Sequence, residues 1–122
     1  MTEPRARIIR EGDANRRSGD GVELVVAVSK ETTGAEHLWF GRFTSEPGVA
    51  IPPHHHTCDT VAYLIRGQAA FQVGTERLEM VPGEYVYVPA NVVHTEETLG
   101  NETAEFIIAR DKAGGETVYL ER

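Results

Sequence analysis

The chain has 122 residues, which is enough for one domain with a single hydrophobic core. Its 12 Lys and Arg are outnumbered by 19 Asp and Glu, and the formal net charge of -7 argues against electrostatic binding to nucleic acid or to an anionic membrane. No apolar run approaches the roughly 20 residues that span a bilayer, and the polar start of the chain lacks the apolar stretch of a signal peptide. The one cysteine cannot form an intramolecular disulfide. We therefore expect a cytoplasmic protein whose partner is a metal or a small molecule.

Residues 1–21 form a charged N-terminal arm, in which five arginines are interleaved with acidic residues. One interpretation is a solvated arm, partly disordered, as charged leaders usually are. The alternative is that Arg7-Ile8-Ile9 adds a strand to a sheet edge, including the edge of a partner subunit, because unpaired edges need covering.

Residues 22–122 consist of short apolar runs separated by turn signals, and we interpret them as one β-domain. About eight runs have the length of a strand and are rich in Val, Ile, Tyr and Phe. These runs are Val22–Val28, Leu38–Phe43, Val61–Ile65, Ala69–Val73, Arg77–Val81, Tyr85–Val88, Ala104–Ala109 and Thr117–Leu120. Glycine- and proline-containing turns separate them, and no segment has a sustained helical period with caps at both ends. The pattern predicts an antiparallel sandwich or barrel.

Four histidines occupy two places in the sequence. His54, His55 and His56 directly follow two prolines, and His94 lies in a second segment punctuated by glycine and proline. Neutral imidazole is a common ligand of first-row transition metals. Alternate residues of an extended strand point to the same face, so His54 and His56 can share one metal while His55 faces away.

The spacing around these histidines resembles the two sequence motifs of the cupin superfamily. The first motif is matched by Gly48, His54, His56 and Gly67, and the second by Gly83, Pro89, Asn91 and His94. The resemblance implies an all-β fold, the antiparallel double-stranded β-helix or jelly-roll barrel of small single-domain cupins. It also implies a metal held inside the barrel by His54, His56 and His94.

The sequence departs from these motifs at three positions. The glutamate that commonly completes the cupin ligand set falls on Thr60, whose neutral hydroxyl is a poor replacement. The glycine of the second motif becomes Asn91, a mild change, because asparagine tolerates the left-handed backbone conformation. The final asparagine of that motif becomes Thr98.

Several groups could fill the place of the missing glutamate. Strand alternation puts Cys58 and Thr60 on the face of His54 and His56, whereas a bulge after His56 would turn Asp59 inward. Asp59 would suit iron, manganese, nickel or zinc, and Cys58 would favour zinc or copper. If none of them reaches the metal, three histidines remain with open coordination positions, as in cupin thiol and diketone dioxygenases.

Two further side chains are candidates for catalytic roles. Glu96 would share a strand face with His94, which suits a carboxylate that supports a ligand or transfers protons. Tyr63 would need a hydrogen-bond partner for its hydroxyl if it is buried. It lies in Val61–Ile65, a run that is apolar at every position, so we expect both faces of this strand to be covered and the protein to form a homodimer.

The resemblance implies a mononuclear metal enzyme that acts on a small organic substrate, with a dioxygenase as the leading expectation and iron(II) as the favoured metal. Zinc, manganese, nickel and copper remain open. So do isomerase, lyase and polyketide cyclase reactions. A fold does not fix a function, and a non-catalytic cupin that binds a metabolite or a metal is the alternative from another class.

Overall fold

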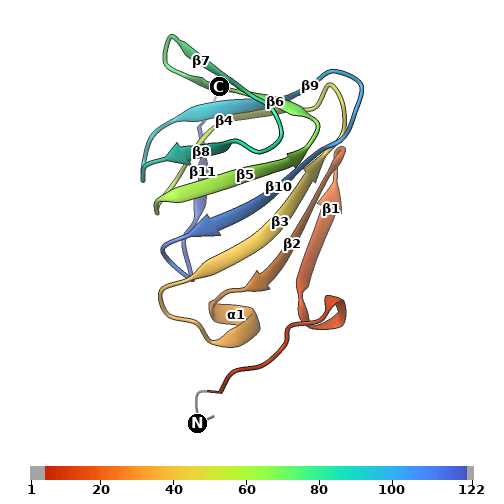
Figure 1. Ribbon diagram of the computed structural model, residues 1–122. Helices are drawn as coiled ribbons and strands as arrows, with labels where there is room; N and C mark the ends of the chain where they lie inside the picture. The colour runs from red at the N-terminus through yellow and green to blue at the C-terminus, as the bar shows by residue number, and fades with distance from the viewer. Residues whose placement is uncertain (1–4, 121–122) are drawn as a thin grey trace.

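The computed structural model describes residues 5–120, which form two antiparallel β-sheets packed face to face (Figure 1). The larger sheet has the order β1-β2-β3-β10-β5-β8, with β1 Asn15–Gly19, β2 Val22–Val28, β3 Trp39–Ser45, β10 Ala104–Arg110, β5 Thr60–Arg66 and β8 Tyr85–Val88. The smaller sheet has the order β11-β4-β9-β6-β7, with β11 Thr117–Tyr119, β4 Ala50–His56, β9 His94–Leu99, β6 Gln68–Val73 and β7 Glu76–Met80. The predicted all-β antiparallel fold is confirmed.

Each of the eight predicted strands is present, and the described residues contain eleven in all. The strands predicted at Val22–Val28 and Tyr85–Val88 have the predicted bounds, while the others differ by one or two residues at an end. The three additional strands are β1, β4 and β9. The last two carry the histidines of the predicted metal site, for which the sequence indicated extended segments without defining their ends.

β1 belongs to the segment that we interpreted as a charged arm, and it forms a hairpin with β2. The two strands pair from Asn15–Val26 to Gly19–Val22, so that the loop is the dipeptide Asp20-Gly21. Both loop residues have positive φ, 54° and 81°, as a type I′ turn requires. Asp-Gly before an apolar run is a strong hairpin signal, and the sequence reasoning missed it. Residues 7–9 lie outside any strand of the single chain, and their addition to a partner's sheet stays a prediction.

Helical structure in the described residues is limited to short turns. η1 is a 3-10 turn at Glu11–Asp13, and α1 is one helical turn at Lys30–Thr33. Ser29 caps α1, since its hydroxyl accepts the Thr32 N–H at 3.2 Å, and Gly34 ends the turn with a left-handed φ of 77°. Among residues 5–120, no helix has the length and apolar character that crossing a bilayer requires.

The hydrophobic core lies between the two sheets. Its buried residues are Ala62, Leu64, Ala69, Phe71, Met80, Val86, Val88, Ala104 and Phe106. Phe71 and Phe106, one from each sheet, meet edge to face with ring centroids 6.2 Å apart. Several of these side chains also line a cavity between the sheets, so the packing that stabilises the fold forms part of the wall of the site.

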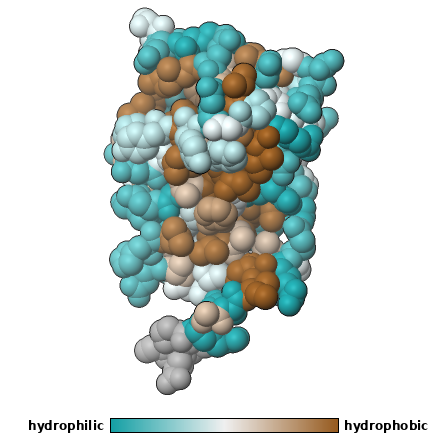
Figure 2. Space-filling view, in the orientation of Figure 1, coloured by the Kyte–Doolittle hydropathy of each residue, from teal (hydrophilic) through white to brown (hydrophobic). Residues whose placement is uncertain are grey.

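The outer face of the larger sheet carries an apolar patch. Val61 and Tyr87 are cross-strand neighbours, as are Tyr63 and Tyr85, and Ala109 joins Val61 to Phe40 on β3. Tyr85 and Tyr87 expose 72% and 62% of their surface. Figure 2, in the orientation of Figure 1, shows apolar side chains gathered across the middle of this face. In the single chain this face of β5 is therefore uncovered.

Candidate metal centre

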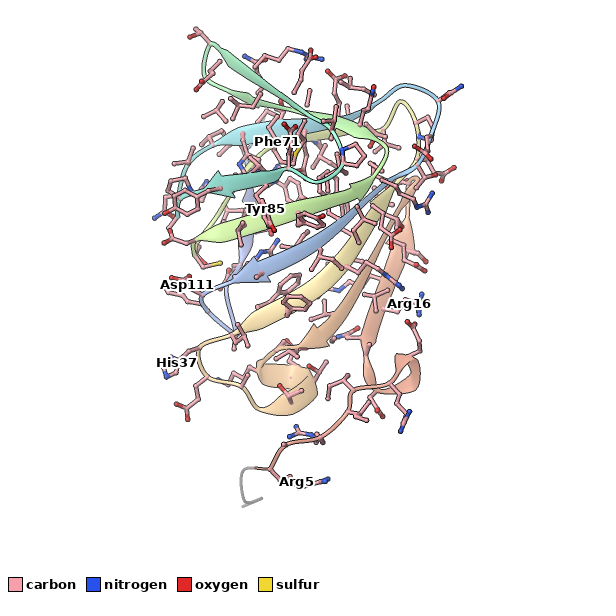
Figure 3. The ribbon with its side chains drawn as sticks, viewed as in Figure 1. Arg5, Arg16, His37, Phe71, Tyr85 and Asp111 are labelled. Atoms are coloured by element: carbon pink, nitrogen blue, oxygen red, sulfur yellow. The ribbon has the colours of Figure 1, made fainter. Side chains whose placement is uncertain are left out.

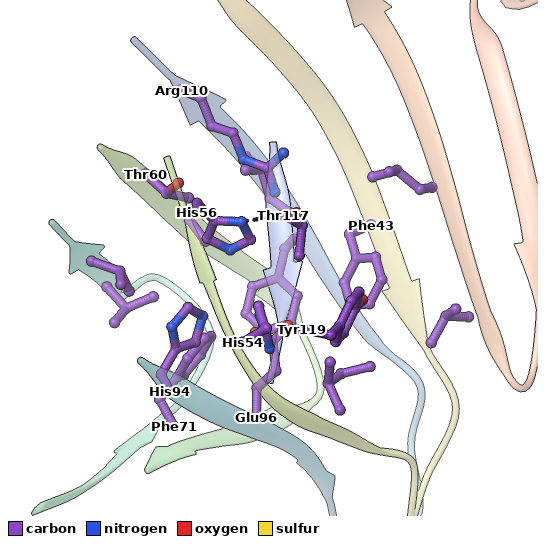
Figure 4. A pocket seen from close by; sticks show the side chains of 18 of the residues that line it. Phe43, His54, His56, Thr60, Phe71, His94, Glu96, Arg110, Thr117 and Tyr119 are labelled. Atoms are coloured by element: carbon purple, nitrogen blue, oxygen red, sulfur yellow. Dashed lines mark hydrogen bonds between the residues drawn. The ribbon is translucent and has the colours of Figure 1, made fainter. Parts of the chain in front are cut away.

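Three histidines converge in the cavity between the sheets (Figure 4). His54 and His56 come from β4 and point to the same face, while His94 begins β9 and is the direct cross-strand partner of His54. All three are buried, with exposed fractions of 2%, 7% and 3%. One ring nitrogen of each lies within 4.8 Å of those of the other two, as three ligands of one ion would. The structure thus brings together the three residues that the spacing predicted.

The second ring nitrogen of each histidine is already occupied. Nδ1 of His54 lies 2.7 Å from the Pro52 carbonyl oxygen, and Nδ1 of His94 lies 3.0 Å from the Val92 carbonyl oxygen. A carbonyl can only accept, so each Nδ1 carries the proton and Nε2 keeps a free lone pair. Nδ1 of His56 lies 3.0 Å from the Thr117 hydroxyl on β11. Such partners fix the tautomer and the ring orientation of metal-binding histidines.

The electrostatics of the site keep the imidazoles neutral. Burial lowers the pKa of His54, His56 and His94, and the nearby positive charge of Arg110 lowers all three further. The pKa of His56 falls to about 3. All three rings therefore present unprotonated nitrogens at neutral pH. This donor set fits a divalent transition metal.

Of the three groups proposed for the place of the missing glutamate, only Thr60 lines the cavity. Asp59 does not reach the histidines, because its carboxylate accepts the Ala90 N–H at 2.8 Å and its own N–H donates to Asp111 at 3.0 Å. Cys58 is buried elsewhere, against the chain at Gly115, where an added Cβ would come within 2.5 Å of its sulfur. Side chains alternate between the two faces of a strand only while the chain is extended, and β4 ends at His56. The alternation therefore does not predict the directions of the side chains at residues 57–59.

Asn91 adopts the conformation predicted for it. Its φ is 67°, in the left-handed region that glycine usually supplies at this place of the motif. Its N–H donates to the carbonyl oxygen of His56 at 2.8 Å. This bond links the loop before His94 to the end of β4, so the substitution preserves the contact between the two motifs.

The two candidate catalytic residues lie on different sides of the sheets. Glu96 lines the cavity with His94, and burial raises its pKa from 4.5 to about 7, opposed by the positive charge of Arg110. Tyr63, the other residue expected to have a catalytic role, instead points to the outer face of the larger sheet. There it packs against Tyr85, with ring centroids 4.8 Å apart. The inward residues of β5 are Thr60, Ala62 and Leu64, so position 63 faces away from the histidines.

The remaining two histidines take no part in the cluster. His55 lies between His54 and His56 on β4 and is absent from the cavity lining, as predicted from strand alternation. His37 projects from the loop before β3, away from the barrel, with 90% of its side chain exposed (Figure 3).

The cavity has a volume of about 380 Å³ and a mixed lining. Aromatic and aliphatic side chains from both sheets form most of the wall, among them Phe43, Ile51, Phe71, Phe106 and Ile108. Its polar groups include three that the sequence reasoning missed, namely Arg17 on β1, Arg110 on β10 and Thr117 on β11. No local motif marks these residues, because only the pairing of distant strands brings them to the histidines.

The family model for the Cupin domain matches residues 41–110, more than half of the chain. This protein is a cupin. Residues 41–110 include both histidine motifs, most of β3 and the strands β4 to β10, so the match covers the three histidines but not β1, β2 or β11. The predicted family and fold are thereby confirmed.

Relatives of this cupin include named enzymes. It is 30% identical over 92 residues to quercetin 2,3-dioxygenase of Bacillus subtilis, covering 72% of this chain and 26% of that protein. It is 29% identical over 87 residues to acireductone dioxygenase of Exiguobacterium sibiricum, covering 67% of this chain and 44% of that protein. An uncharacterized protein of Streptomyces coelicolor is 30% identical over 82 residues, covering 67% of this chain and 72% of that protein.

Among solved structures, oxalate decarboxylase from Bacillus subtilis at pH 4.6 superimposes with a TM-score of 0.79 at 22% identity. The match covers 95% of this chain and 33% of that chain, and at this identity it shows the fold alone. The chain spans less than half of the length of the named dioxygenases and of the decarboxylase that it matches.

Proposed function

We propose that this cupin binds one divalent transition metal through His54, His56 and His94 and acts as a dioxygenase on a small organic substrate, with iron(II) as the working metal. The observation that carries the proposal is the cluster of three buried, neutral imidazoles, each with its second nitrogen already hydrogen-bonded. Two relatives bear the name of dioxygenases.

The residues of the cavity divide the work of such an enzyme. The three histidines would hold the metal, which as iron would supply the activation of dioxygen and of a bound oxygen atom of the substrate. Glu96 would hold or release a proton at its carboxylate, since its pKa of about 7 leaves both forms populated near neutral pH. The apolar wall, with Phe43, Phe71 and Phe106, would exclude water from the substrate.

The metal site can be tested by elemental analysis of untagged protein purified without chelator. We expect about one metal ion per chain, lost in His94→Ala and retained in His55→Ala, because only the first removes a ring from the cluster. Circular dichroism should show that both variants are folded. Full metal content in His94→Ala would contradict the ligand assignment.

The reaction can be tested by oxygen uptake with the iron-loaded protein, using quercetin and an acireductone, the substrates named in two relatives. Uptake with either compound that disappears in His94→Ala would support the dioxygenase. A protein that holds zinc, manganese or nickel and consumes no oxygen would instead support isomerase, lyase or cyclase chemistry. Metal or ligand binding without any turnover would support a non-catalytic cupin.

We also propose that the protein is a cytoplasmic homodimer, in which the apolar outer face of the larger sheet packs against a second copy. Val61, Ile65, Tyr85 and Tyr87 present contiguous apolar surface there, of a kind that soluble monomers rarely leave uncovered. Light scattering should give the mass of a dimer, and Tyr85→Glu should reduce it to that of a monomer. A monomeric wild-type protein would contradict the proposal, and cell fractionation would test the location.

A further inference from the structure

Arg110 ends the inward row of β10 and enters the cavity beside the histidines. Figure 4 shows its side chain directed toward His56 and Thr117. The guanidinium lies over the Trp39 ring, 4.2 Å from the ring centroid, so that one of its faces is covered by the indole. Register explains this contact, because Trp39 is the cross-strand partner of Arg110 on β3.

Arg110 has no counter-ion among residues 5–120. It takes part in none of the ion pairs or side-chain hydrogen bonds of this part of the chain, and its buried Nε lacks an acceptor there. Other arginines of the sheets, such as Arg16 and Arg77, each form short ion pairs. Arg17 on β1 also has no ion pair among residues 5–120, but it is exposed, whereas Arg110 is only partly exposed and its Nε is buried. Burying part of a guanidinium without an anion is costly, so Arg110 points to a ligand.

A second unsatisfied group lies next to it. Thr60 on β5 is the other cross-strand partner of Arg110, and its hydroxyl is buried and lines the same cavity. Among residues 5–120 the only group near enough to bond it is the Cys58 thiol, which is a weak hydrogen-bonding group and leaves the hydroxyl without a strong partner. Two neighbouring donors, one charged and forked and one neutral, thus face the same space beside His56. A planar carboxylate could accept from both at once, as the fork geometry of arginine favours.

We propose that Arg110 and Thr60 form the binding site for the carboxylate of the substrate, and that the substrate is a small monocarboxylate with an apolar body. The apolar part would lie against Phe43, Phe106 and Ile108, within a cavity of about 380 Å³. Thr60 occupies the position at which the cupin motif usually carries a glutamate, so the ligand supplies the carboxylate that the protein lacks there. This role deepens the proposed function and depends on it for the chemistry, although not for the binding.

The experiment uses phenylacetate as the probe and phenylacetamide as its neutral analogue of equal size. Both are titrated calorimetrically into metal-free protein and into zinc-loaded protein, and the single tryptophan, which contacts Arg110, gives a second readout by fluorescence. We expect phenylacetate to bind and phenylacetamide to bind at least about tenfold more weakly. Equal binding of the two, or no binding of phenylacetate in either form of the protein, would overturn the proposal.

Variants locate the site. Arg110→Met should weaken phenylacetate binding at least about tenfold, whereas Arg66→Met, which removes an equal charge from β5 outside the cavity lining, should change it less than about twofold. Unchanged binding in a folded Arg110→Met protein would refute the assignment. If Arg110→Met does not fold, Thr60→Glu replaces it as the test. A carboxylate opposite Arg110 should abolish phenylacetate binding, and retained binding would refute the site.

Metal content, measured on the same samples, separates this inference from the proposed function. Arg110-dependent binding of phenylacetate by a protein that takes up no metal would leave the carboxylate site standing while the metalloenzyme proposal fails. One metal ion per chain, together with phenylacetate binding that is unchanged in Arg110→Met, would support the metalloenzyme proposal and refute the carboxylate site.

Discussion

Glu96 should make the metal-free protein less stable as the pH rises, and Glu96→Gln should remove this loss. The pKa of Glu96 rises from 4.5 to about 7 in the folded protein, mainly because burial disfavours the carboxylate. Between these values the folded protein holds a proton that the unfolded chain releases. The protonated Glu96 therefore contributes its full stabilisation of the folded protein below about pH 4.5, and this contribution is lost as the pH rises through 7. At about 1.36 kcal/mol for each pKa unit, the rise from 4.5 to about 7 corresponds to about 3 kcal/mol of stability.

The assay is urea unfolding of wild type and Glu96→Gln in the presence of a chelator, at about pH 5 and about pH 8.5. The histidines act with the opposite sign, since their lowered pKa values cost stability as the pH falls below about 6.5, but they are common to both proteins and cancel. We expect wild type to lose about 2 to 3 kcal/mol more than the variant. Glu97→Gln, next along β9 and ion-paired with Arg77 at 2.8 Å, is the matched control. A difference between wild type and Glu96→Gln that does not change with pH would refute the burial of Glu96.

Three further predictions test the supports of the site. Thr117→Val should weaken zinc binding about 10- to 100-fold, because it removes the hydroxyl that holds Nδ1 of His56. Among residues 5–120 this is the only ligand Nδ1 held by a side chain, since backbone carbonyls hold those of His54 and His94. Competition with a chromophoric chelator measures the zinc affinity. Asp59→Ala should leave zinc affinity unchanged but cost about 1 kcal/mol in urea unfolding, because it removes the acceptor of the Ala90 N–H, which lies outside the cluster. A clear loss of zinc affinity would instead show that Asp59 is a ligand. Gly67→Ala should cost at least about 1 kcal/mol, because its φ is 85° and an added Cβ would lie 2.7 Å from the backbone of β10; an unfolding midpoint equal to that of wild type would contradict this.

The sequence predicted the ligands because their geometry is local. Two histidines one residue apart on a strand must share a face, and His94 stands at the spacing of the partner motif. The same alternation failed at Cys58, since it holds only while the chain stays extended and β4 ends at His56. It could not decide the side of Tyr63 either, because Val61–Ile65 is apolar on both faces.

Arg110 could not have been found in this way. It ends a run that the sequence predicted to stop at Ala109, and its position in the cavity depends on the pairing of β10 with β5 and β3, which are far away in the chain. The hairpin of β1 and β2 is a different case. Asp20-Gly21 was visible as a turn signal, but the surrounding charge favoured a solvated arm, and the contribution of β1 to the cavity wall was missed.

Charge balance connects the parts of the cavity. Three neutral imidazoles would leave both positive charges of a divalent metal uncompensated, and Arg110 adds another without a counter-ion among residues 5–120. The acids that line the cavity are Asp20, in the exposed turn of the β1–β2 hairpin, and Glu96, whose pKa is already raised by burial. A cupin that kept the usual glutamate at position 60 would neutralise part of this charge itself. With Thr60 in its place, an anionic ligand would satisfy both Arg110 and the metal, so we expect acidic substrates to bind in preference to neutral ones.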